Sequence, residues 1–262
     1  MKIAIIGGGN LGSAIAEGLL KSKFSQAGDI IITKRNTATL KPFKEKGIEV
    51  TDNNAAAVRK SKIIILAVKP FQANEVLNSI KKELTGGKLL ISVVTGVTIS
   101  EIEGLLKKNI PLFRAMPNTA IAIQQSMTCI CSHQAGPADI KYVNELFSKL
   151  GKVVTIDEEL MEAATILGAC GTAYAMRYIR ANIQGGIEIG FDAATASLVA
   201  AQTVKGAADL LLQNGNHPEQ EIDKVTTPKG CTIAGLNEME HMGFSSSLIR
   251  GLIVSYKKIA KE

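Results

Sequence analysis

The sequence predicts an α/β domain with a doubly wound, mostly parallel sheet, followed by an all-helical C-terminal domain. Between Lys2 and about Thr155, short β-branched runs alternate with amphipathic stretches of helical length, a pattern typical of βα units on a parallel sheet. After about Asp157 the strand pattern ends and long helical stretches follow. We therefore expect one domain at residues 1–157 and a second at residues 158–262.

Short apolar runs indicate the strands of the first domain. The run from Ile63 to Val68 has no polar alternation, which predicts a central strand buried on both faces. The expected strands are Lys2–Ile6, Ile30–Thr33, Ile63–Val68, Leu89–Val93, Leu112–Ala115, Thr128–Cys131 and Val153–Thr155. The helical candidates between them are Leu11–Lys21, Thr37–Lys46, Ala73–Glu83 and Pro137–Leu150.

Capping residues indicate where the helices of the second domain begin and end. We expect Asp157 to cap the first long helix, and Asp192 to begin another that ends at Gly215, since aspartate favours helix starts and glycine helix ends. Pro218 suits the start of a third helix, and residues 232–242 and 246–259 also fit helices. Small residues permit close helix packing, including packing between subunits: Ala193, Ala194, Ala196, Ala200, Ala201, Gly206 and Ala207.

Composition excludes several classes of function. Aromatic residues make up 4% of the chain and tryptophan is absent, so a base-stacking surface for nucleic acid is not expected. A net charge of +6 suits an anionic small ligand. The most apolar stretch, Leu160 to Ile179, contains Glu162 and Arg177, which argues against a membrane span. The N-terminus lacks a long apolar run, and we expect a cytoplasmic protein.

The four cysteines have no metal-ligand spacing. They include no Cys-x-x-Cys pair and no histidine at a suitable distance, so we expect reduced thiols and no metal. Cys129 and Cys131 fall in an expected strand and are assigned to the core, and Cys170 and Cys231 are expected to be small buried side chains.

A glycine motif indicates a dinucleotide site. Gly7, Gly9 and Gly12 form G-x-G-x-x-G directly after the first strand and at the start of the first helix. The first glycine permits a tight turn, the second lets the backbone approach a pyrophosphate, and the third lets helix and strand pack closely. The helix N-terminus offers amide donors and a positive dipole end to the phosphates. The first domain is therefore expected to be a Rossmann domain.

The residues after the second strand favour NADPH over NADH. NAD-binding domains place an Asp or Glu there for the ribose 2′-hydroxyl, but this chain has Thr33, Lys34, Arg35 and Asn36. Two cations in place of a carboxylate suit a 2′-phosphate.

Four segments carry a more specific pattern: Ile5–Asn10, Leu66–Pro70, Arg114–Thr119 and Val225–Thr232. In this order, and across nearly the whole chain, they resemble pyrroline-5-carboxylate reductases, which reduce a cyclic imine to proline in the last step of proline biosynthesis. The chain departs from the family where Thr227, Lys229 and Cys231 replace a Ser, a Gly and a Thr or Ala, and where Ala169–Tyr174 replaces Gly-Ser-Gly-Pro-Ala-Tyr. The resemblance implies an architecture like that of 6-phosphogluconate dehydrogenase.

The resemblance also implies roles for particular residues. NADPH, with NADH possible, is expected to contact Gly7, Gly9, Asn10, Leu11, Gly12, Lys34, Arg35, Ala67, Val68, Lys69, Pro70 and Asn118. The carboxylate of 1-pyrroline-5-carboxylate is expected at a helix N-terminus formed by Thr227, Gly230, Cys231 and Thr232. Thr165 and Thr232 are the candidate catalytic residues. The expected assembly is a homodimer or a decamer of dimers.

Two other functions fit parts of the sequence. A related Rossmann reductase or 3-hydroxy-acid dehydrogenase would act on another small substrate and use a helical-domain lysine, for which Lys205 is the candidate. A non-catalytic NADP-binding regulator would keep the fold but lose the substrate loop, where Lys229 and Cys231 depart from the family.

Overall fold

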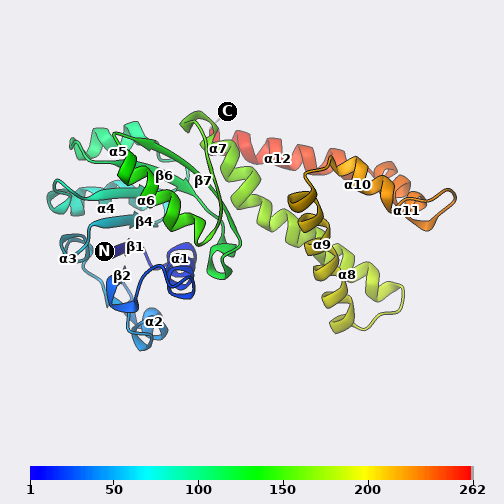
Figure 1. The fold of residues 1–262 in the computed structure, drawn as a ribbon, viewed down its shortest axis with the longest axis horizontal. Helices are drawn as coiled ribbons and strands as arrows, with labels where there is room; N and C mark the ends of the chain where they lie inside the picture. The colour runs from blue at the N-terminus through cyan, green and yellow to red at the C-terminus, as the bar shows by residue number, and fades with distance from the viewer. Residues whose placement is uncertain (261–262) are drawn as a thin grey trace. The chain divides into compact units, whose positions relative to one another are not determined.

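The computed structural model describes residues 1–260 and divides into two compact units (Figure 1). The first unit contains Met1–Cys170 together with residues 259 and 260, and the second unit contains Gly171–Lys258. The division lies later than the expected boundary at residue 157 because the segment after it packs on the first unit. Met161 is wholly buried in one of the two cores of that unit, and Glu158 pairs with Arg114 of the sheet.

An eight-stranded sheet forms the centre of the first unit, in the order β3-β2-β1-β4-β5-β6-β7-β8. The pairs from β3 to β6 are parallel, β6 and β7 are antiparallel, and β7 and β8 are again parallel, which confirms the expected fold class. The strands are β1 (Ile3–Ile6), β2 (Ile30–Thr33), β3 (Glu49–Thr51), β4 (Ile63–Leu66), β5 (Leu89–Ser92), β6 (Leu112–Met116), β7 (Ser126–His133) and β8 (Gly151–Thr155).

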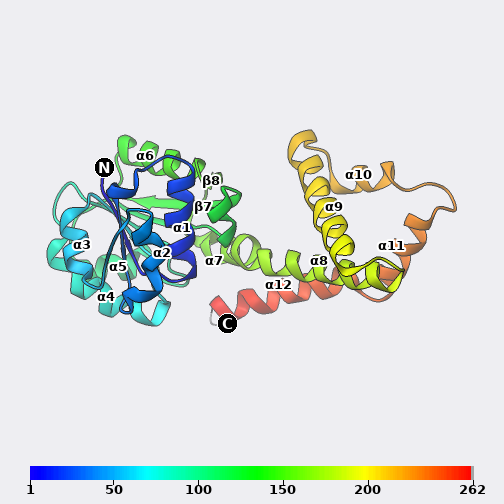
Figure 2. The ribbon, with the colours of Figure 1, turned by 90° about the horizontal axis from the view of Figure 1, so that it is seen from below.

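Alternate strand residues build two cores, one on each face of the sheet. Ile64 and Leu66 of β4 point to one face, while Ile63 and Ile65 point to the other, so the prediction of a doubly buried central strand is confirmed. One face packs against α3 (Asn54–Lys60), α4 (Ala73–Ile80) and α5 (Ile99–Leu106). The opposite face packs against α1 (Asn10–Lys21) and α6 (Pro137–Ser148) (Figure 2). The short α2 (Lys41–Glu45) precedes β3.

The chain leaves the sheet through a helix of mixed type. A 3₁₀ turn (Glu158–Leu160) leads into α7 (Met161–Ala164), a π-helical segment (Thr165–Cys170) and then α8 (Gly171–Glu188). Asp157 stands at the N-cap position, as expected, but its side chain makes no capping hydrogen bond and the first turn after it is 3₁₀ rather than α-helical.

The second unit is entirely helical within its described residues. After α8 come α9 (Ala193–Asn214), α10 (Pro218–Lys224), α11 (Cys231–His241) and α12 (Phe244–Ala260). As expected, Asp192 caps α9 by accepting hydrogen bonds from two backbone amides, and Gly215 ends it in the left-handed conformation. Tyr174 of α8 and Ser255 of α12 share a 2.7 Å hydrogen bond. Through residue 260, no helix combines the length and apolarity needed to cross a membrane.

Candidate cofactor and substrate sites

Close backbone packing accounts for two of the three motif glycines. Gly7 has a φ of +111°, and a Cβ there would lie 2.6 Å from the carbonyl oxygen of Ala67. A Cβ on Gly12 would lie 2.0 Å from the carbonyl oxygen of Gly7. Gly9, at the N-terminus of α1, has no heavy atom within 4 Å of its Cβ position. The turn is therefore locked by Gly7 and Gly12 and left open at Gly9, where a phosphate would approach.

The open turn borders a cleft of about 570 Å³ in the first unit. All the expected cofactor residues line it except Gly12, which packs against Gly7, and Asn118. The structure adds lining residues that the sequence analysis did not assign to the cofactor: Gly8, Thr33, Asn36, Asn54, Gln72, Val76, Val93, Thr95 and Thr119. The adjoining N-terminus of α1 can bind a phosphate through its free backbone amides, so the chemistry of this cleft fits a dinucleotide.

The carboxyl end of β2 presents a hydroxyl where an NAD-binding domain would place a carboxylate. Thr33 Oγ1 accepts a hydrogen bond from the Gly7 amide at 3.2 Å and donates one to Asn54 Oδ1 at 2.6 Å. Lys34 and Arg35 follow at the edge of the cleft, and Arg35 lies 3.6 Å from the Glu75 carboxylate in an exposed ion pair. At the end of β2 the cleft thus has two cationic side chains and no carboxylate, an arrangement that fits a 2′-phosphate.

The residues expected to bind substrate gather at the N-terminus of α11. Gly230 is the N-cap residue and no side chain caps the helix, so the amides of the first turn have no partner within the helix. The Gly230 amide donates to the Thr227 carbonyl at 2.9 Å, and a Cβ on Gly230 would lie 2.5 Å from Thr227 Oγ1. Lys229 has a φ of +59°. The loop thus keeps Thr227, Gly230, Cys231 and Thr232 within one tight turn.

Thr165 is the first residue of the π-helical segment, and Asn118 contacts this segment from the end of β6. Thr165 is buried, and its hydroxyl donates to the Met161 carbonyl at 2.8 Å. Asn118 donates from Nδ2 to the Gly168 carbonyl at 3.1 Å and accepts from the Ala120 amide. Asn118 therefore connects the end of β6 to this segment, while its neighbour Thr119 lines the cleft.

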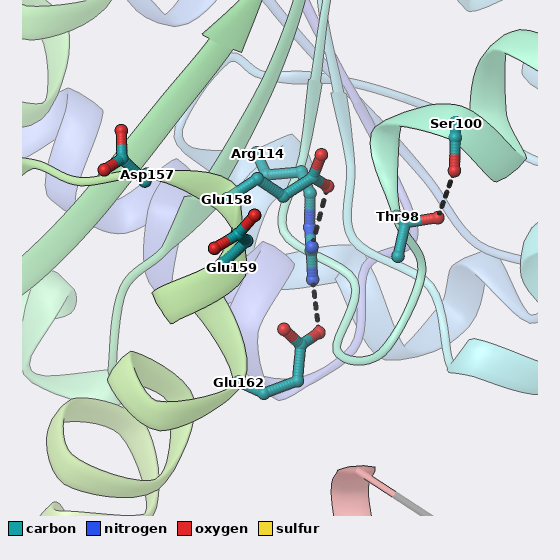
Figure 3. Close-up of a pocket in the computed structure, with 7 residues that line it drawn as sticks. All are labelled: Thr98, Ser100, Arg114, Asp157, Glu158, Glu159 and Glu162. Atoms are coloured by element: carbon teal, nitrogen blue, oxygen red, sulfur yellow. Dashed lines mark hydrogen bonds and ion pairs between the residues drawn. The ribbon is translucent and has the colours of Figure 1, made fainter.

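A buried arginine beside a second cavity has no counterpart among the expected site residues. Arg114 of β6 is 1% exposed, and its guanidinium donates to Glu158 at 2.9 Å and to Glu162 at 3.0 Å (Figure 3). Burial acts to lower the pKa of Arg114, but the hydrogen bonds to Glu162 and Glu158 outweigh it and raise the pKa, so the guanidinium stays charged. Thr98, Ser100, Asp157 and Glu159 complete the lining of this cavity of about 560 Å³.

The cysteines only partly follow expectation. Cys131 is buried and Cys129 half-buried, and burial raises the pKa of both thiols. The expectation of burial is wrong for Cys231, which is exposed in the first turn of α11, and Cys170 is half-buried. Among the residues that the structure describes, no cluster of His, Cys, Asp and Glu could hold a metal ion.

This fold and cleft define a Rossmann oxidoreductase that takes a dinucleotide. Two family models match the chain: pyrroline-5-carboxylate reductase dimerisation over residues 158–262, and NADP oxidoreductase coenzyme F420-dependent over residues 2–96. Pyrroline-5-carboxylate reductase 2 of Dictyostelium discoideum is 44% identical, covering 99% of this chain and 92% of its own length. The chain belongs to the pyrroline-5-carboxylate reductase family.

Other relatives agree with this membership. Pyrroline-5-carboxylate reductase 1 of Dictyostelium discoideum is 50% identical over 98% of this chain, which spans about half the length of that relative (49%). The crystal structure of Plasmodium falciparum pyrroline carboxylate reductase with NADP bound has a TM-score of 0.90 and 28% identity, covering 99% of this chain and 97% of that one. A 3-hydroxyisobutyrate dehydrogenase from Mycobacterium tuberculosis, at 12% identity and a TM-score of 0.54, shares the fold alone.

Proposed function

We propose that this chain reduces 1-pyrroline-5-carboxylate to L-proline with NADPH, in the last step of proline biosynthesis. The observation that carries the proposal is the cleft in which an open glycine turn and the cations Lys34 and Arg35 come together. The chain also aligns over almost its full length with relatives named pyrroline-5-carboxylate reductase. The chain is accordingly an NAD(P)H-dependent oxidoreductase, with NADPH the preferred cofactor and NADH a possible substitute.

Different residues of the cleft would bind different parts of the cofactor. The glycine turn and the N-terminus of α1 would hold the pyrophosphate, while Lys34 and Arg35 would bind the 2′-phosphate. When bound, the nicotinamide supplies a hydride to the imine carbon. Ala67, Val68, Lys69 and Pro70, which follow β4 along the cleft, would orient the nicotinamide half.

The substrate needs an anion site more than it needs a protein acid. Protonation of the imine nitrogen makes the neighbouring carbon electron-poor, so a substrate that arrives protonated requires no strong general acid. The first-turn amides of α11 and the Thr232 hydroxyl would bind the carboxylate with help from the helix dipole. Thr165 is the second candidate for hydrogen bonding near the reacting ring, since its hydroxyl can still accept a bond while it donates to Met161.

The assembly and the location of the chain extend the same proposal. The dimerisation model over residues 158–262 supports an oligomer, which we propose to be a homodimer or a decamer of dimers. We propose the cytoplasm as its location, and a small molecule rather than a nucleic acid or a membrane as its partner.

One assay tests the function. NADPH absorbance at 340 nm should fall when 1-pyrroline-5-carboxylate is added to the purified chain, and proline should accumulate in equal amount. Unchanged absorbance would favour an NADP-binding regulator instead. Oxidation of a 3-hydroxy acid would favour the related dehydrogenase, although Lys205, its candidate lysine, forms a 2.6 Å exposed ion pair with Asp209.

A further inference from the structure

Arg114 has a charged side chain at a buried position, where removing the charge from water is energetically costly. Its side chain is 1% exposed within a strand whose other residues are buried, and its Nε makes no hydrogen bond to any residue within 1–260. Buried ion pairs commonly stabilise a fold no more than apolar residues of the same volume would. An incompletely bonded arginine at this place therefore calls for a role other than stability.

The first partner of Arg114 connects three elements. Glu158 Oε1 accepts from Arg114 Nη1 at 2.9 Å and also from the Ile99 amide at 2.7 Å. Ile99 is the first residue of α5, and the loop before it contains Val93 and Thr95, which line the cofactor cleft. One carboxylate thus fixes the 3₁₀ turn before α7, the strand β6 and the cofactor-lining loop relative to one another.

The second partner leads to the π-helical segment. Glu162 lies on α7, one turn before Thr165, and accepts from Arg114 Nη2 at 3.0 Å (Figure 3). Within the segment, the Gly168 carbonyl accepts a hydrogen bond from Asn118, which follows β6. The turn before the π-helical segment is therefore bonded to β6, and Gly168 within the segment is bonded to Asn118, two residues after β6. Turns of π-helix are commonly found at functional sites.

We infer that Arg114, with Glu158 and Glu162, is a positioning cluster that holds the Thr165–Cys170 segment in its π-helical form against the cofactor-binding unit. Arg114 acts through these carboxylates and touches neither cofactor nor substrate in this role. The expected effect of this cluster on the reaction rate rests on the proposed function, in which Thr165 forms a hydrogen bond near the reacting ring. The expected effect on the π-helical segment is independent of that function.

Amide hydrogen exchange of the chain without cofactor tests the segment directly. Arg114→Met should speed exchange across residues 161–170 at least tenfold relative to the rest of the chain. The matched control is Arg59→Met, which removes the exposed pair of Arg59 with Glu83 and should leave residues 161–170 unchanged. Leu146→Ala removes a buried side chain of α6 on the other face of the sheet, and provides a destabilised control without selective exchange.

Kinetics test the consequence for the reaction. Arg114→Met should lower kcat at least tenfold while the NADPH Kd stays within about twofold of wild type, and Arg114→Lys should recover part of kcat. If Arg114→Met does not fold, Glu162→Leu should show the same selective exchange and loss of kcat. Glu162→Gln, whose amide oxygen can still accept from Arg114, should give a smaller effect on both.

Two results would overturn the inference. The first would be an amide exchange rate at residues 161–170 that rises no more in Arg114→Met than in Leu146→Ala, when the two variants are compared at equal loss of stability. The other is a kcat per folded molecule equal to wild type in every Arg114 and Glu162 variant. If wild type itself fails to reduce 1-pyrroline-5-carboxylate, the proposed function is wrong, and the exchange experiment still decides whether the cluster holds the segment.

Discussion

Lys34 and Arg35 should set the choice of cofactor through a few hydrogen bonds to one phosphate. Each charge-assisted bond contributes about 1.5–3 kcal/mol, so replacing both residues with alanine, which removes at least one such bond from each, should weaken NADPH binding by at least about 100-fold. NADH lacks the 2′-phosphate, and its Kd should change by less than about threefold. Fluorescence titration of both cofactors measures the difference, and an equal loss for both would show that these cations do not read the 2′-phosphate.

Glu75 should oppose that preference, because its carboxylate lies 3.6 Å from Arg35 at the edge of the cleft. An incoming 2′-phosphate must compete with it for the guanidinium. Glu75→Gln should therefore tighten NADPH binding by about two- to fivefold at low salt, an effect that salt screens because both side chains are exposed. Lys41→Gln, which removes another exposed charge, from the Lys41–Glu45 pair, is the control and should leave the Kd unchanged.

Thr232 should bind the substrate carboxylate through its hydroxyl, in the first turn of α11. Loss of one hydrogen bond to a charged group costs about 1.5–3 kcal/mol, so Thr232→Val should raise the KM for 1-pyrroline-5-carboxylate by roughly 10- to 150-fold. NADPH affinity should barely change, since the cleft lined by the glycine turn belongs to the other unit. Thr227→Val should cost less if that side chain only supports the loop. A KM for Thr232→Val within about threefold of wild type would place the carboxylate elsewhere.

Among the elements, the loop before α11 depends on two neighbouring backbone positions. Lys229 is left-handed with a φ of +59°, which costs a non-glycine residue about 1 kcal/mol, so Lys229→Gly should leave stability unchanged or raise it slightly. Gly230 has an ordinary φ of −71°, but a Cβ would meet Thr227 Oγ1 at 2.5 Å and the Thr227 carbonyl at 3.0 Å. Gly230→Ala should therefore displace the loop and raise the substrate KM at least tenfold with NADPH affinity unchanged. A KM equal to wild type would show that the loop does not bind substrate.

The elements that the sequence could predict are those with a strong local pattern. The all-apolar run of β4 and the capping pair Asp192 and Gly215 of α9 are local signals, and both predictions are confirmed. The edge strand β3 was not predicted, because its three residues are half-exposed and two of them are polar. The π-helical segment was also missed, since the bonds that hold it come from Arg114 and Asn118, which are about 50 residues away in the sequence.

The sites divide in the same way. The glycine turn and the residues after β4 could be placed from motifs, because each lies in a short stretch of chain. Asn54, 21 residues from its partner Thr33, enters the cleft through a hydrogen bond that no motif encodes. Arg114 was recognised only as part of a motif, since its partners Glu158 and Glu162 are 44 and 48 residues away. Pairings of this kind become visible only once the sheet brings the segments together.

At the scale of the whole molecule, the helical unit has more apolar surface than one chain can cover. Helices α8, α11 and α12 have no buried residue in the single chain. Large apolar side chains are exposed along α9 and α12: Leu198, Leu212, Ile249, Ile253 and Val254. Apolar surface of this extent on a monomer usually marks an interface, and a second copy of the chain would cover it, in agreement with the dimerisation model over these residues.

The mass in solution should therefore be at least twice the 27.8 kDa of one chain by light scattering at micromolar concentration. Val254→Lys places a charge on α12, and in a twofold interface each substitution acts twice, so the unpaired buried charges should dissociate the oligomer and lower Tm. Because dissociation is concentration-dependent, the Tm of wild type should rise with protein concentration while that of the variant should not. Ile140→Lys, at an exposed position of α6 in the first unit, is the control and should keep the mass of wild type. A wild-type mass of one chain would contradict the assembly, and an unchanged mass for Val254→Lys would place the interface away from this part of α12.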